Sequence, residues 1–197
     1  MRLRSWGPIY LGLALYAVFQ ALPRTPNHES LERFGWPSVV AMTGCGLWLI
    51  AAAHDMQWAT VLIIVASAGA LTAPLLKRPA QPTPSAFWLI EAPLALLAGW
   101  LTIASAINLL TVLTAEGFIE NALLWAAIGI VAVAAITGLI GWRSLAPFYL
   151  PPVVWGLIGV AVAEAARKPQ ISWLALGAAL ALAGLAAAVV HRRQALR

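Results

Sequence analysis

Residues 87–114 read FWLIEAPLALLAGWLTIASAINLLTVLT, the longest apolar run of the chain, with Glu91 as its one charged residue. A helix of about 20 residues crosses the hydrocarbon core of a bilayer, so this run is long enough to span a membrane. Only helices and closed barrels satisfy every backbone group in lipid. Because the run lacks the alternating polarity of a barrel strand, it predicts a transmembrane helix.

The rest of the 197-residue chain has the same character. Hydrophobic residues make up 62% of the whole chain and charged residues 10%, whereas a soluble domain is about 45 to 50% apolar and about 25% charged. We therefore exclude a soluble fold and predict an all-α, polytopic transmembrane helical bundle of about seven helices, forming a single integral membrane domain over residues 1–197. Charged or proline-rich breaks separate the seven apolar segments, which are 5–22, 37–53, 58–76, 87–114, 121–141, 146–166 and 171–190.

The first segment has a second interpretation. Met1-Arg2-Leu3-Arg4 before an apolar run also resembles a secretory signal peptide. Its apolar stretch is longer than a usual signal-peptide core, and no small-x-small cleavage site precedes Pro23. We therefore favour a spanning helix.

The basic residues predict the orientation of the bundle. The net charge is +5, but Lys and Arg stand in pairs between apolar segments and form no basic face, so we expect no nucleic acid partner. Cytoplasmic loops keep the excess of Lys and Arg, which places the C-terminus in the cytoplasm of a bacterial cell and the N-terminus outside. One side holds Arg24, Arg33, Lys77, Arg78, Arg143, Arg192, Arg193 and Arg197, and the other holds Arg2, Arg4, Arg167 and Lys168.

Two carboxylates lie inside the predicted spans, where ionisable residues are costly. Glu91 occupies the first turns of the fourth segment, where the helix dipole stabilises a negative charge; a ligand contact or a proton site is the alternative. Glu164 precedes Arg167 and Lys168 at i+3 and i+4, which predicts an ion pair on one helix face. No segment centre holds a charged residue, which argues against a pump built on charged relays.

The remaining reactive side chains form no recognisable catalytic or metal-binding constellation. His28, His54 and His191 lie at segment ends or in loops, so axial ligands for a haem inside the bundle are missing. Cys45 is the single cysteine and has no metal-ligand spacing around it. We expect no metal, no resident cofactor and no enzyme activity. An intramembrane enzyme pairing Glu91 with His54 is kept as a third hypothesis, although the two are predicted on opposite sides.

Ten tryptophans are the other compositional anomaly. Trp36, Trp58, Trp88, Trp142 and Trp173 lie at segment edges, as expected for an aromatic belt. The others lie deeper, where an indole suits either packing between helices or stacking on a planar apolar ligand. These deeper residues are Trp48, Trp100, Trp125, Trp155 and, near the chain start, Trp6.

Several short motifs are similar to those of a known family. Trp6-Gly7-Pro8-Ile9-Tyr10 resembles the opening of bacterial tryptophan-rich sensory proteins, which are relatives of the translocator protein (TspO/MBR) family. Trp48 matches the Trp of an Asn-x-x-Trp element of TspO, with Cys45 in place of the Asn. Trp100 and Asn108 keep the Trp-to-Asn spacing of the last TspO helix. Residues 153–159, VVWGLIG, resemble the larger bacterial branch of this family.

The resemblance implies a fold and a site. Segments one to four, residues 1–114, would correspond to TspO helices two to five, and residues 115–197 would add three transmembrane helices. The implied partners are the lipid bilayer, a porphyrin or another planar apolar ligand, and a second copy in a homodimer. Because the chain begins almost at the Trp-Gly motif, we expect either a start further upstream or a pocket that lacks one wall. The implied pocket residues are Trp6, Tyr10, Trp48, Trp100 and Asn108, to which Glu91 is added as a candidate contact.

The sequence thus predicts an integral membrane binding or sensory protein with an intramembrane pocket for a planar apolar ligand such as a tetrapyrrole. The alternative is a transporter or permease component for a small hydrophobic molecule, because broken helices often line translocation sites. Prolines that can interrupt the helices stand at Pro93, Pro147, Pro151 and Pro152.

Overall fold

The structure is a computed structural model that describes residues 7–21, 29–77 and 83–195, with the backbone alone at residues 8–10. Helices make up nearly all of this part of the chain, and it contains no strand. The predicted all-α bundle of seven helices is therefore confirmed. In chain order the elements are α1 (Gly7–Ala21), α2 (Glu29–Ala53), α3 (Gln57–Leu76), a continuous helix made of α4 (Pro84–Ala86), η2 (Phe87–Glu91) and α5 (Ala92–Ala115), then α6 (Ala122–Ser144), η3 (Pro147–Tyr149), α7 (Leu150–Glu164) and α8 (Pro169–Ala195).

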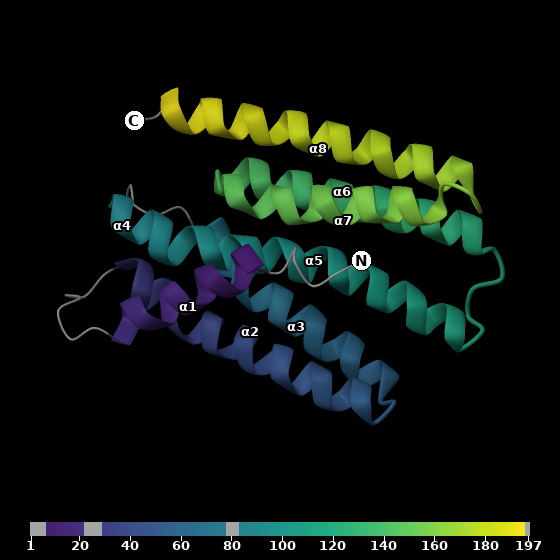
Figure 1. The fold of residues 1–197 in the computed structure, drawn as a ribbon, viewed down its shortest axis with the longest axis horizontal. Helices are drawn as coiled ribbons and strands as arrows, with labels where there is room; N and C mark the ends of the chain where they lie inside the picture. The colour runs from purple at the N-terminus through teal and green to yellow at the C-terminus, as the bar shows by residue number, and fades with distance from the viewer. Residues whose placement is uncertain (1–6, 22–28, 78–82, 196–197) are drawn as a thin grey trace.

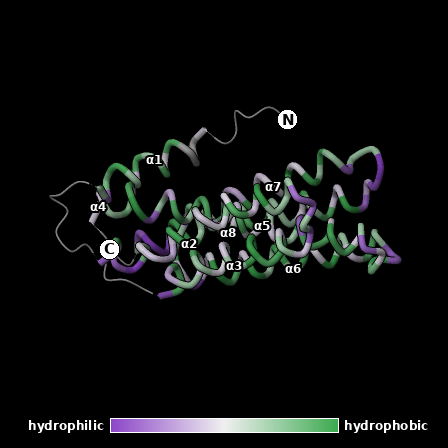
Figure 2. Tube along the Cα trace, turned by 90° about the horizontal axis from the view of Figure 1, so that it is seen from below, coloured by the Kyte–Doolittle hydropathy of each residue, from purple (hydrophilic) through white to green (hydrophobic). Residues whose placement is uncertain are grey.

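Six helices of the described chain are long and apolar enough to cross a membrane. The first helix is apolar but shorter, since α1 has 15 residues and about 1.5 Å of rise per residue gives it about 22 Å. Hydrophobic residues line the middle of the helices and hydrophilic residues gather toward the two ends of the bundle (Figure 2). This distribution matches a slab of hydrocarbon between two aqueous faces.

The central helix α5 separates two hydrophobic cores (Figure 1). On one side it packs with α1, α2 and α3 around Tyr16, Phe34, Leu71 and Leu94, which are fully buried. On the other side it packs with α6 and α7, and α8 packs in turn on those two helices. The fourth predicted segment is therefore the element on which both halves of the bundle assemble.

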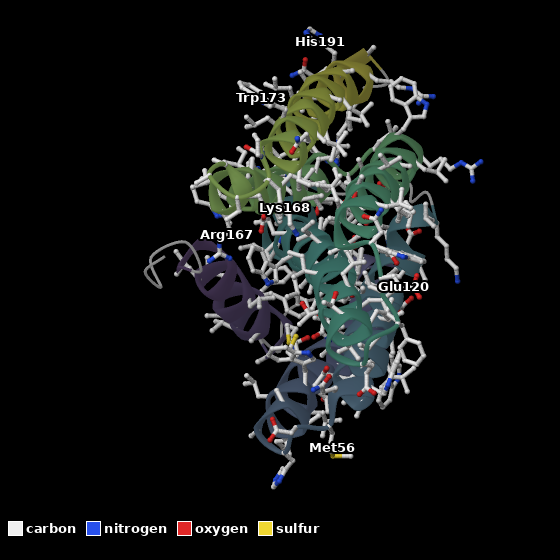
Figure 3. The ribbon with its side chains drawn as sticks, turned by 90° about the vertical axis from the view of Figure 1, so that its right-hand side faces the viewer. Met56, Glu120, Arg167, Lys168, Trp173 and His191 are labelled. Atoms are coloured by element: carbon white, nitrogen blue, oxygen red, sulfur yellow. The ribbon has the colours of Figure 1, made fainter. Side chains whose placement is uncertain are left out.

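The helices alternate in direction, which places the connections at two opposite ends (Figure 1). One end carries the start of α2, the end of α3, the α6–η3 turn and the end of α8. The other end carries the three connections before α3, α6 and α8, and it faces the viewer in Figure 3, with Met56, Glu120, Arg167 and Lys168 labelled. The sequence predicts the same grouping of the loops on two sides.

Two helices begin at least three residues earlier than predicted. Helix α2 begins at Glu29, not at residue 37, and contains Pro37, because its first turns pack Phe34 into the core, at 0% exposure. The fourth segment begins at Pro84 after Thr83, whose Oγ1 accepts a hydrogen bond from the Ala86 amide at 3.3 Å. A Thr cap followed by proline at the first helical position is a favoured helix start.

One turn of the fourth segment is a π-helix, Phe87–Glu91. The Ala92 amide donates to the Phe87 carbonyl, five residues back. Pro93 explains the wider turn, because a proline ring in an α-helix collides with the carbonyl four residues earlier and has no N–H to donate. The helix continues through Pro93 without a break, and this turn sets where Glu91 lies.

Candidate functional site

A cavity of about 600 Å³ lies between α2, α3 and α5. Its volume falls within the range of about 300 to 1,000 Å³ that is usual for small-molecule sites. Leu13 of α1 and Gly156 of α7 contribute to its edges. The remaining lining residues are Met42, Gly44, Cys45, Trp48 and Leu49 of α2, Ile64 and Ser67 of α3, and Leu97, Trp100, Leu101, Ile103, Ala104, Ile107, Asn108 and Thr111 of α5.

Three of the residues predicted for a pocket line this one cavity. Trp48 comes from α2, whereas Trp100 and Asn108 come from α5. Helix α3 packs against both of these helices and forms the base between them. The fold therefore brings together an indole on each wall, although 52 positions separate them in the sequence.

The polar groups around the cavity are few and are mostly hydrogen bonded within the protein. Asn108 Nδ2 donates to Thr60 Oγ1 at 3.0 Å, Ser67 Oγ donates to the Ile63 carbonyl at 2.7 Å, and Thr111 Oγ1 donates to the Ile107 carbonyl at 2.8 Å. These bonds leave the hydroxyl and amide oxygens as acceptors. The site is thus an apolar space with a few polar atoms on its walls.

The indole N–H of Trp48 is an exception. Its Nε1 atom is buried and has no hydrogen-bond partner. A buried donor without an acceptor costs about 1 to 3 kcal/mol, and most buried donors in proteins are paired. The apolar surroundings of Trp48 thus leave one donor in the cavity wall unsatisfied.

Two of the predicted pocket residues cannot be placed against the cavity. Trp6 lies outside the described residues. Tyr10 belongs to α1, one turn before the cavity residue Leu13, but its side chain is also outside the described part. These two assignments stay predictions.

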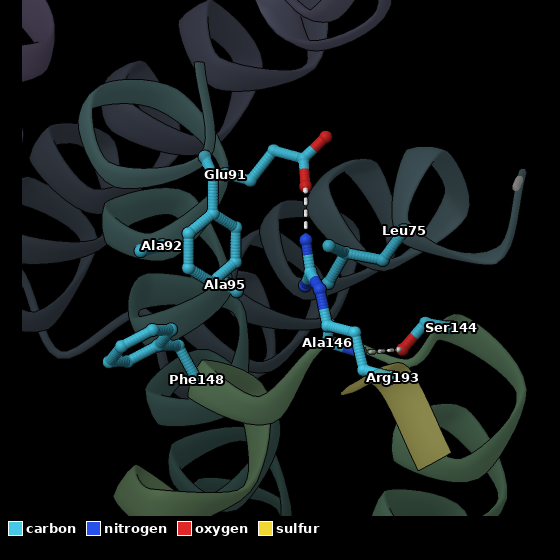
Figure 4. A pocket seen from close by; sticks show the side chains of 9 residues that line it. Leu75, Glu91, Ala92, Ala95, Ser144, Ala146, Phe148 and Arg193 are labelled. Atoms are coloured by element: carbon cyan, nitrogen blue, oxygen red, sulfur yellow. Dashed lines mark hydrogen bonds and ion pairs between the residues drawn. The ribbon is translucent and has the colours of Figure 1, made fainter. Parts of the chain in front are cut away.

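Glu91 lies apart from the cavity, in an ion cluster near the start of α2. Figure 4 shows its carboxylate facing the guanidinium of Arg193. Its Oε1 pairs with Arg33 Nη2 of α2, and its Oε2 lies 4.0 Å from Arg193 Nη2 of α8. Ser30 Oγ donates to Glu91 Oε1 at 3.4 Å. The two arginines also cap helix ends, because Arg33 Nη1 donates to the Lys77 carbonyl at 3.1 Å and Arg193 Nη1 to the Leu145 carbonyl at 3.3 Å.

This ion cluster (Arg33, Glu91 and Arg193) joins elements that are far apart in sequence. The three side chains are 11 to 18% exposed, and the Arg193 guanidinium lies 4.1 Å from the centroid of the Phe87 ring. Two positively charged side chains, and not the helix dipole alone, therefore hold the Glu91 carboxylate.

Two pairings considered from the sequence are not formed. The Glu164 ion pair is wrong for the described residues, because the Glu164 Oε2 atom is buried whereas Arg167 is exposed, and only the backbone amides of Arg167 and Lys168 donate to the Glu164 carbonyl. Glu164 Oε2 is instead buried without a hydrogen-bond partner. Glu91 and His54 do not meet either, since Glu91 contacts Ser30 near the start of α2 and His54 follows its end, which puts them about 36 Å apart along the helix.

The described tryptophans outside the cavity face outward. Trp125 and Trp155, interior by their position in the sequence, are 39% and 46% exposed on the bundle surface. The depth of a residue along a segment therefore did not distinguish pocket from lipid-facing positions. The five predicted belt residues are exposed as well, namely Trp36, Trp58, Trp88, Trp142 and Trp173.

Most of the other cavity residues carry no signal in the sequence. Met42, Leu97 and Ile103 are ordinary apolar residues of predicted spans. Gly44 and Ala104 are small, and at Gly44 a Cβ would collide with the Ser67 hydroxyl of α3, but small residues occur throughout the chain. One signal in the sequence points to these residues: their spacing from Trp48 or Trp100 places them on the same face of the helix.

Comparison with known proteins gives one match. The family model described as TSPO-like protein matches residues 4–188, which reaches from the N-terminal Trp-Gly motif into α8. No curated protein and no solved structure matches the chain. Because the match covers nearly all of the chain, and the described part of it holds six helices long and apolar enough to cross a membrane, this multi-pass membrane protein belongs to the TSPO-like protein family.

Proposed function

We propose that the protein is a membrane receptor or sensor that binds a planar apolar ligand, such as a tetrapyrrole, in the cavity between α2, α3 and α5. The observation that carries the proposal is the position of Trp48 and Trp100 on the two walls of one cavity of about 600 Å³. Planar ligands stack on indole faces and gain from burial of their own apolar surface. Membership of the TSPO-like family supports this function for the chain.

The direct test is a titration of intrinsic tryptophan fluorescence in lipid nanodiscs with protoporphyrin IX, added in separate runs as the free acid and as the dimethyl ester. We expect saturable quenching by at least one form at one ligand per protein. Trp48→Phe and Trp100→Phe should weaken the binding, because each removes part of an indole wall.

Trp173→Phe is the matched control, since Trp173 is 73% exposed and lies on α8 away from the cavity. Its titration should give the wild-type dissociation constant. The proposal is wrong if neither porphyrin form quenches saturably, or if both cavity variants bind as tightly as wild type.

We also propose that the end holding the ion cluster faces the cytoplasm of a bacterial cell. Among the described residues this end carries five Lys or Arg, and the opposite end carries two. An excess of basic residues marks cytoplasmic loops. A fluorescent-protein fusion after the C-terminus should fold and fluoresce, whereas a periplasmic phosphatase fusion there should be inactive; the reverse pattern would overturn the orientation. The five are Arg33, Lys77, Arg143, Arg192 and Arg193, and the two are Arg167 and Lys168.

A further inference from the structure

The cavity is uncharged on every wall that the structure describes. None of its lining residues is Asp, Glu, His, Lys or Arg. The polar side chains are a thiol, two hydroxyls, one amide and two indoles, at Cys45, Ser67, Thr111, Asn108, Trp48 and Trp100. Such a lining offers hydrogen bonds to a ligand but no counter-ion for a charged one.

The two arginines that lie beside Glu91 are already engaged elsewhere. Arg33 and Arg193 both face Glu91 and also donate to backbone carbonyls. Glu91 precedes Trp100 by nine residues, so the ion cluster lies about 13 Å along the helix from that indole. Among the described residues, a carboxylate beside Trp48 and Trp100 would therefore find hydrogen-bond donors but no cation to pair with.

Burying an unpaired carboxylate costs far more than burying a neutral polar group. Within a bilayer the same cost applies during entry, because a charged group must also cross hydrocarbon. An ester that replaces the carboxylate keeps its acceptor oxygens and loses the charge. The cavity lining therefore discriminates between ligands that share one ring system and differ only in charge.

The cavity also reaches the outer surface of the bundle through apolar residues. Leu49 on α2 and Ile107 on α5 line it and are 63% and 46% exposed. Both lie in helices long and apolar enough to cross a membrane, so these exposed atoms contact lipid tails rather than water. A ligand that passes between these helices arrives from the hydrocarbon.

We infer that the cavity selects uncharged planar ligands that enter from the bilayer, and that it disfavours the same ring system carrying free carboxylates. This inference rests on the proposed function, because it names the class of ligand that the site accepts. It makes the charge of the ligand, and not its ring alone, the determinant of affinity.

The test compares protoporphyrin IX with its dimethyl ester at pH 8 in neutral-lipid nanodiscs, with dissociation constants corrected for the measured partition of each compound into empty nanodiscs. We expect the ester to bind at least about tenfold more tightly, a difference of about 1.4 kcal/mol. A variant that places a cation at the mouth, Ile107→Arg, should reduce this preference by strengthening binding of the free acid. Val162→Arg is the control, since Val162 is exposed on α7 and does not line the cavity.

The outcomes separate the two proposals. Equal or tighter binding of the free acid to the wild-type protein overturns the selection for uncharged ligands and leaves the proposed function standing. An unchanged preference in Ile107→Arg, with the variant folded and still binding the ester, also overturns the inference. Absence of saturable binding by either compound overturns the proposed function itself.

Discussion

At the scale of single residues, the hydrogen bond between Asn108 and Thr60 fixes the one amide side chain of the cavity. Asn108 Nδ2 donates to Thr60 Oγ1 at 3.0 Å, and Thr60 Oγ1 donates to the Gln57 carbonyl at 2.6 Å. The bond links α5 to α3, so Asn108 both joins two helices of the bundle and lines the proposed ligand site. A residue with both roles can lose binding through either one, and a stability measurement is needed to separate them.

Asn108→Ala should lower the free energy of unfolding by about 0.6 kcal/mol, the average for a polar contact between membrane helices. Thr60→Val should cost more, because it also removes the bond to Gln57. A double-mutant cycle on unfolding in mixed micelles measures the coupling between the two sites. Strict additivity of the two substitutions would show that the interhelical bond contributes nothing.

The same scale shows what the sequence could and could not tell about the site. The resemblance to the TspO family predicts Trp48, Trp100 and Asn108 as pocket residues, and the structure places all three on one cavity. Glu91 was also flagged, but only the fold reveals Arg33 and Arg193 beside it, since these residues lie 58 positions before and 102 positions after it. Trp125 and Trp155 were indistinguishable from Trp48 by depth, because the period of a helix and not its length decides which face a residue occupies.

At the scale of elements, hydrophobicity located the seven helices but missed some of their ends. Residues 29–36 carry Glu29, Glu32 and Arg33 and therefore do not read as part of a span, yet they continue α2 because Arg33 has a buried partner. The π-turn at Phe87–Glu91 was also not predicted. Its cause, Pro93, is visible in the sequence, but whether a proline breaks, kinks or widens a helix depends on the neighbouring helices.

The ion pair between Arg33 and Glu91 holds the start of α2 against the π-turn. Removing one partner of a buried pair leaves an uncompensated charge, at a cost of about 3 to 5 kcal/mol in a fully buried setting; the 11 to 12% exposure of these side chains reduces it. We expect Glu91→Gln to lower the thermal stability measurably. The exchanged pair, Arg33→Glu with Glu91→Arg, should recover only part of it, because Arg193 then faces a positive charge.

Thermal unfolding checks this prediction. It is measured for wild type, for Glu91→Gln, for Arg33→Glu and Glu91→Arg as single variants, and for the exchanged pair. Glu32→Gln is the control, since Glu32 lies on the same helix, is exposed and is not part of the ion cluster. The prediction fails if Glu91→Gln unfolds at the wild-type temperature.

Close helix packing in the second half of the bundle depends on Gly99. A Cβ at this position would lie 2.1 Å from the Tyr149 carbonyl oxygen, a backbone atom that cannot move aside alone. Gly99→Ala should therefore separate α5 from η3 and lower the stability. Gly177→Ala on α8 is the matched control because a Cβ there meets nothing within 4 Å; equal effects of the two substitutions on thermal unfolding would contradict the prediction.

At the scale of the whole molecule, α5 divides the bundle into a part that holds the cavity and a part that does not. Helices α1, α2 and α3 surround the cavity with α5, whereas α6, α7 and α8 form a second core on its other side. The match to the TSPO-like family covers both parts. The second core therefore supports the wall that carries Trp100 and Asn108.

The central claim is that the space between Trp48 and Trp100 is a ligand site, and filling that space tests it most directly. Ala104 lines the cavity, so Ala104→Phe puts a ring where the ligand would lie, while Ala132→Phe puts the same ring on an exposed face of α6. The measurement is the rise in unfolding temperature on adding protoporphyrin IX dimethyl ester, because a ligand that binds only the folded state stabilises it. We expect the unfolding temperature to rise for wild type and Ala132→Phe and to stay unchanged for Ala104→Phe, with all three proteins folded without ligand. An equal rise in Ala104→Phe would contradict it.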